Sequence, residues 1–65
     1  MGNVERCLRE FELSDGTECR VELNEGRQIH IHMDNLKIQF SIAEFLEFAN
    51  TTKRAEDELR RIKEI

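Results

Sequence analysis

The fold of this chain follows from a short motif that occurs twice, as Glu12-Leu13-Ser14-Asp15-Gly16-Thr17 and, ten residues later, as Glu22-Leu23-Asn24-Glu25-Gly26-Arg27. A glycine that ends a three-residue loop is typical of a β-hairpin, because that position requires a positive φ that glycine adopts without strain. A third turn, Asp34-Asn35, follows. Three successive turns predict four antiparallel strands that run as a meander, over residues of about 4–13, 17–23, 27–33 and 36–41.

The segments between these turns alternate apolar and polar residues. Strict period-two alternation is typical of a sheet with one dry face and one wet face. The loop lengths predict that Phe11 lies opposite Cys19 and that Val21 lies opposite Ile29. They also predict that Cys7 lies opposite Leu23. The alternation in the first strand is less regular, which indicates a β-bulge or a second apolar patch.

The predicted register places both cysteines on the dry face but far apart. Cys7 and Cys19 would be separated by about 13 Å along the strands, whereas a disulfide requires Cα atoms within about 7 Å. We therefore expect no intramolecular disulfide and two small apolar side chains, as is usual in the cytoplasm.

A helix is predicted to begin directly after the fourth strand. The sequence Ser41-Ile42-Ala43-Glu44 matches a capping box, and helix-forming residues continue to about residue 64. The weak helix formers at residues 50–52 leave two alternatives, one continuous helix or a break at that point. An apolar stripe over the first two turns would cover the dry face of the sheet. It consists of Ile42, Phe45, Leu46 and Ala49.

The predicted fold class is therefore α+β, within one domain over residues 1–65. It is a four-stranded antiparallel β-meander of order 1-2-3-4 with a C-terminal α-helix packed on one face. The expected core consists of Phe11, Leu13, Cys19, Val21, Leu23, Ile29, Ile31, Met33, Leu36, Ile38, Phe40, Ile42, Phe45, Leu46 and Ala49.

The predicted helix is longer than the sheet that it covers. A helix over residues 42–64 would be about 34 Å long, whereas strands of six or seven residues span about 20–23 Å. Its second half nevertheless keeps apolar residues at alternating three- and four-residue spacings, as a coiled-coil seam does. The seam predicts a homodimer, with intramolecular docking and a frayed tail as the alternatives. The seam begins at Phe45. The predicted interaction residues are those that follow it in the seam, Phe48, Thr52, Ala55, Leu59 and Ile62.

Size and charge narrow the function classes. A chain of 65 residues lies near the lower limit for independent folding, which favours association with a second subunit. The net charge of −4 opposes binding to nucleic acid or to an anionic membrane surface. There is no apolar run of about 18 residues that could span a membrane, nor a signal peptide. We therefore expect a cytoplasmic protein.

A metal site is the alternative function. His30 and His32 are two residues apart on one strand, so both imidazoles would point the same way from the wet face. The predicted register places Glu18 beside His32 as a third ligand, but it also places Arg20 and Lys37 next to the histidines, and these cations oppose metal binding.

No constellation indicates catalysis, a cofactor or a small-molecule substrate. The sequence thus predicts a non-catalytic module that associates with itself or with a protein partner through its C-terminal helix.

Overall fold

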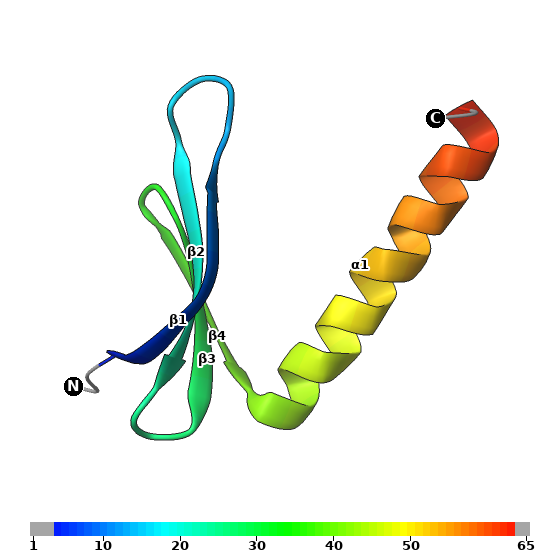
Figure 1. The fold of residues 1–65 in the computed structure, drawn as a ribbon. Coiled ribbons are helices and arrows are strands. Elements are labelled where there is room, and N and C mark those ends of the chain that lie inside the picture. Colours follow the sequence, from blue (N-terminus) through cyan, green and yellow to red (C-terminus); the bar gives the residue numbers. More distant parts are fainter. Residues whose placement is uncertain (1–3, 64–65) are drawn as a thin grey trace.

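The computed structural model describes residues 4–63 and confirms the predicted fold class. Four strands, β1 (Val4–Glu12), β2 (Glu18–Asn24), β3 (Gln28–Met33) and β4 (Leu36–Ser41), pair in the order β1-β2-β3-β4, each antiparallel to the next. The helix α1 (Ile42–Lys63) follows β4 without an intervening residue and packs against β3 and β4 (Figure 1).

The first and third turns have the predicted form. Gly16 adopts a φ of 94°, and the Thr17 amide donates to Asp15 Oδ1 over 2.9 Å. This bond holds the pKa of the Asp15 carboxyl below its usual value, because it stabilises the ionised form. At the third turn Asp34 has a φ of 55°, a conformation that aspartate tolerates. The predicted pair of Phe11 with Cys19 is confirmed, and Met33 lies opposite Leu36 across the third turn.

The second turn differs from the prediction, and it changes the pairing of β2 with β3. Arg27, with a φ of 61°, takes the left-handed position instead of Gly26, and its amide donates to the Asn24 carbonyl over 2.9 Å. The loop therefore begins one residue later than predicted. As a result Val21 lies opposite Ile31 rather than Ile29. This shift of two residues leaves each side chain on its predicted face.

Two irregularities in β1 overturn the predicted position of Cys7. The register of β1 against β2 shifts between Val4 and Arg6 and again between Cys7 and Arg9. Because of the second shift, Cys7 lies opposite Glu22 instead of Leu23, and it is exposed rather than buried. Bulges bend a strand, and the first half of β1 turns away from the helix (Figure 1). The two cysteines are free thiols, as predicted.

The predicted capping box begins the helix. The Glu44 amide donates to Ser41 Oγ, and the Ser41 amide donates to Glu44 Oε1, each over 3.1 Å. The helix then runs without a break through residues 50–52, so the alternative of two helices is wrong. Because no loop separates β4 from α1, the capped first turn fixes the direction in which the helix leaves the sheet.

Loss of this cap should destabilise the protein measurably. We expect Ser41→Ala to lower the free energy of unfolding by about 1 kcal/mol, because the Glu44 amide then loses its acceptor. Ser14→Ala, in an exposed turn, is the matched control and should be neutral. Urea denaturation followed by circular dichroism measures both. Equal effects of the two substitutions would contradict the role of the cap.

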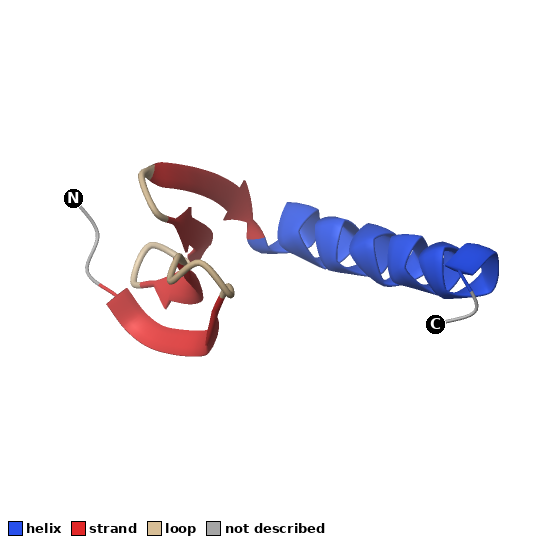
Figure 2. Ribbon diagram, turned by 90° about the horizontal axis from the view of Figure 1, so that it is seen from above, coloured by secondary structure: helices blue, strands red, loops and turns tan. Residues whose placement is uncertain are grey.

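The core is much smaller than predicted. The buried apolar residues are Cys19 and Ile29, with 3% and 4% of their surface exposed, and no residue of the described helix is buried. The prediction was wrong for five residues that are exposed by 37–62%, which are Phe11, Leu13, Met33, Leu36 and Leu46. The physical reason is the course of α1, which projects away from the strands and contacts β3 and β4 but not β1 or β2 within the described residues (Figure 2).

Candidate interaction surface

The dry face of the sheet is organised in rows that cross the strands. The near row, beside the start of the helix, contains Leu23, Ile29 and Phe40. The far row, at the opposite end of the strands, contains Phe11, Cys19, Met33 and Leu36.

The helix covers part of the near row and leaves most of the far row uncovered. It contacts β3 and β4, and in the near row Phe48 stacks on Phe40 with ring centroids 5.1 Å apart and Ile29 is buried. In the far row Phe11 and Leu36, at the two ends, are 60% and 55% exposed and Met33 is 37% exposed, whereas Cys19, between Phe11 and Met33, is buried. The far row is therefore an apolar surface whose large side chains are exposed.

The second half of the helix also carries apolar residues that no part of the sheet covers. Among the predicted interaction residues, the structure brings Phe48 to the sheet of its own chain and places the others beyond that contact. Thr52 and Ala55 are exposed, and Leu59 and Ile62 are 49% and 65% exposed. We call Thr52, Ala55, Leu59 and Ile62 the helix stripe. Leu46, predicted to cover the sheet, instead faces solvent with 62% of its surface exposed.

The second half of the helix is supported by ion pairs along its own surface. Lys53 Nζ lies 2.7 Å from Asp57 Oδ1, and Arg60 Nη2 lies 2.8 Å from Glu56 Oε2; Arg61 also pairs with Glu58. The hydrogen bond that Lys53 donates to Asp57 raises the pKa of Lys53, and the hydrogen bond that Glu56 accepts from Arg60 lowers the pKa of Glu56. Pairs at this spacing stabilise a helix without tertiary contacts. The helix stripe is thus presented on a segment whose ion pairs lie within the helix itself.

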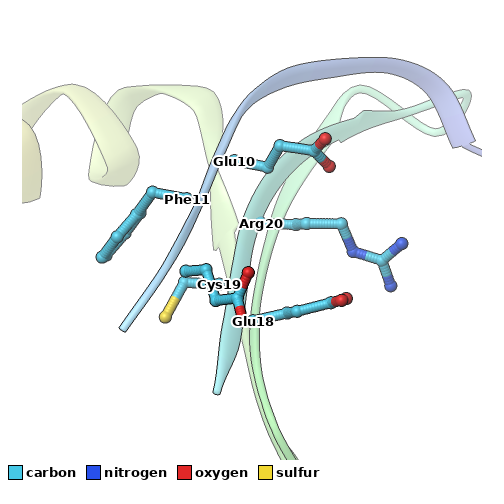
Figure 3. Close-up of a pocket in the computed structure, with 6 residues that line it drawn as sticks. Glu10, Phe11, Glu18, Cys19 and Arg20 are labelled. Atoms are coloured by element: carbon cyan, nitrogen blue, oxygen red, sulfur yellow. The ribbon is translucent and has the colours of Figure 1, made fainter. Parts of the chain in front are cut away.

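A shallow pocket lies beside the far row. Its volume is about 310 Å³, and its lining includes Phe11, Cys19 and three acidic residues, Glu10, Glu12 and Glu18. Phe11 and Cys19 point to the helix side of the sheet, whereas Glu10, Glu18 and Arg20 point to the other side (Figure 3). The charged side chains Glu10, Glu18 and Arg20 therefore lie on the face of the sheet opposite the far row (Figure 3).

The opposite face of the sheet was predicted to be exposed to water, but part of it is buried. Glu22, Asn24 and His30 are buried on it, with 4–7% of their surfaces exposed. Glu22 Oε1 lies 3.1 Å from His32 Nε2 and Glu22 Oε2 lies 3.7 Å from Arg20 Nε. The Asn24 amide Nδ2 lies 2.7 Å from His30 Nδ1. These contacts partner the Glu22 carboxylate and the Asn24 Nδ2 group, which would otherwise be costly to bury, whereas Asn24 Oδ1 is buried without a hydrogen-bond partner.

The geometry does not assemble the predicted metal site. The residue opposite His32 on β2 is Arg20, not Glu18, and the residue opposite His30 is Glu22. In the part of the chain that the structure describes, no three His, Cys, Asp or Glu side chains lie together as a metal-binding group. Metal binding by His30, His32 and Glu18 stays an untested prediction that no geometry here favours.

Sequence reasoning assigned Phe11, Met33 and Leu36 to the core and did not recognise them as surface. One signal could have revealed them. The capping box follows β4 directly, so no loop allows the helix to turn back across β2 and β1.

The surface of the whole chain is large for its mass. It amounts to 5520 Å² for 7.7 kDa, whereas a compact monomer of this mass exposes about 4,300 Å². The radius of gyration is 13.6 Å, against about 11 Å for a compact domain of this length. Both values reflect a helix that stands away from an open sheet.

The described part of the chain contains no helix that is both long enough and apolar enough to cross a membrane. Comparison of the sequence with protein-family models, with curated proteins and with solved structures gives no match.

Proposed function

We propose that this protein is a non-catalytic interaction module that forms a homodimer in the cytoplasm through its C-terminal helix. The observation that carries the proposal is the helix stripe. Leu59 and Ile62 are 49% and 65% exposed at the end of a helix whose charged residues pair among themselves. Apolar residues at regular spacing on a stable, projecting helix fit a protein partner.

The surface area supports a partner of substantial size. An excess of about 1,200 Å² over a compact monomer exceeds the roughly 800 Å² that each partner buries in a standard protein–protein interface. A second copy of the chain is the simplest partner, because it would add apolar burial to a domain with little core. The net charge of −4 argues against nucleic acid as the partner.

The proposal predicts that the protein is a dimer and that the helix stripe holds it together. Sedimentation equilibrium should give twice the chain mass of 7.7 kDa. Replacing both Leu59→Asp and Ile62→Asp should raise the dissociation constant at least about 100-fold, since the loss of two apolar contacts corresponds to about 3 kcal/mol. The same change should lower the melting temperature, because folding and association are linked.

The matched control adds two aspartates to the other side of the same helix. Ala43→Asp with Asn50→Asp changes the net charge equally, at exposed positions roughly opposite the helix stripe by helical periodicity. This variant should remain dimeric. A wild-type protein that is monomeric at high micromolar concentration would refute the proposal.

A further inference from the structure

We infer that the surface contacted by the helix stripe is the far row of the second copy, so that two chains exchange their helices. Each helix stripe would lie on the partner's Phe11, Met33 and Leu36, rather than pair only with the partner's helix. This inference rests on the proposed homodimer and names the surface that completes it.

The first argument is that the helix of a chain does not reach the far row of the same chain. The helix begins at Ile42, directly after β4, and its capping box fixes the first turn. Within residues 4–63 it contacts β3 and β4 but neither β1 nor β2, and its free end lies well away from the strands (Figures 1 and 2). Phe11 and Cys19 point to the side of the sheet on which the helix stands (Figure 3). Cys19 is already buried within the chain, but Phe11 is 60% exposed and is not covered by its own helix.

The second argument is that the two bare surfaces match in extent. The helix stripe from residue 52 to residue 62 is about 15 Å long. The far row crosses four strands, a width of about 14 Å at the usual strand separation. Both are apolar, and the large apolar side chains of both are exposed. In a two-fold dimer each copy supplies one stripe and one row, so the contact forms twice and the pair is closed.

Isotope-filtered NMR on a dimer of one labelled and one unlabelled chain tests the contact directly. We expect intermolecular nuclear Overhauser effects between the Phe11 ring and the methyl groups of Leu59 and Ile62. Sedimentation equilibrium of Phe11→Ser should show a dissociation constant raised at least about tenfold, the factor for a loss of about 1.4 kcal/mol. Because Phe11 is 60% exposed, this change spares the monomer fold.

Leu8→Ser is the matched control, since Leu8 is an exposed apolar residue of the same strand at a bulge away from the far row. It should leave the dimer intact. A dimer that survives Phe11→Ser and shows contacts only between helices would overturn the helix exchange but not the proposed function. Contacts from Phe11 to the helix of its own chain would also overturn it. A monomeric wild type would overturn both.

Discussion

Ile29→Ala is expected to remove about half of the free energy of unfolding of the protein at 25 °C. Truncation of a buried isoleucine costs about 2–5 kcal/mol, whereas a domain of this length has a total stability of about 3–10 kcal/mol. Ile29 lies at the centre of the near row, opposite Leu23 on one side and Phe40 on the other. With 4% of its surface exposed, it is one of two buried apolar residues in the described chain, so few other contacts compensate for its loss.

The measurement is urea denaturation by circular dichroism at one fixed protein concentration, because association would make stability concentration-dependent. Leu46→Ala is the matched control. It removes a comparable side chain that is 62% exposed, so we expect a change within about 0.5 kcal/mol. A loss at Leu46 as large as the loss at Ile29 would mean that the helix lies flat on the sheet through Leu46 in solution.

The local elements could be predicted because they depend on short-range chemistry. Gly16 adopts the positive φ that its loop requires, and Ser41 and Glu44 form the capping box that their spacing indicates. The order of the strands followed from the three turns. Each of these features involves residues no more than a few positions apart, so the interacting residues can be identified from their spacing in the sequence.

The register of β2 against β3 could not be predicted in the same way, because it depends on which residue of the loop takes a positive φ. Glycine prefers that conformation, yet Arg27 adopts it and Gly26 does not. Asn24 explains the difference. Its buried amide contacts His30, which keeps Asn24 in the strand and moves the turn one residue along. A side-chain contact between neighbouring strands thus accompanies the departure from the local preference.

The sequence also predicted which face of the sheet the residues of β2 and β3 lie on, but not how far each face is buried. Alternation correctly placed Ile29 and His30 on opposite faces, but it does not state how much of either face is covered. The predicted wet face buries Glu22 and His30, and the predicted dry face exposes Phe11 and Leu36. Both differences follow from the course of distant elements, namely the bulged β1 and the diverging helix, and no pattern within a strand encodes them.

The burial of polar side chains on the predicted wet face should have its largest effect on protein stability at Glu22. If its face were wet, Glu22→Ala would be neutral. In the structure the side chain is 7% exposed and its carboxylate lies within ion-pair distance of His32 and Arg20. We therefore expect Glu22→Ala to destabilise the protein by about 1.5–3 kcal/mol, the range for hydrogen bonds that involve a charged group.

Three further variants separate the buried contact from a general loss of charge. Glu18→Ala, which removes an exposed carboxylate from the same strand and face, should change stability by less than about 0.5 kcal/mol. Glu22→Gln should lose less than Glu22→Ala, because its amide oxygen still accepts from His32 Nε2. In a double-mutant cycle Glu22→Ala and His32→Ala should be coupled by about 1 kcal/mol. Additive effects would mean that the 3.1 Å contact contributes nothing and that Glu22 stabilises the sheet only through its packing.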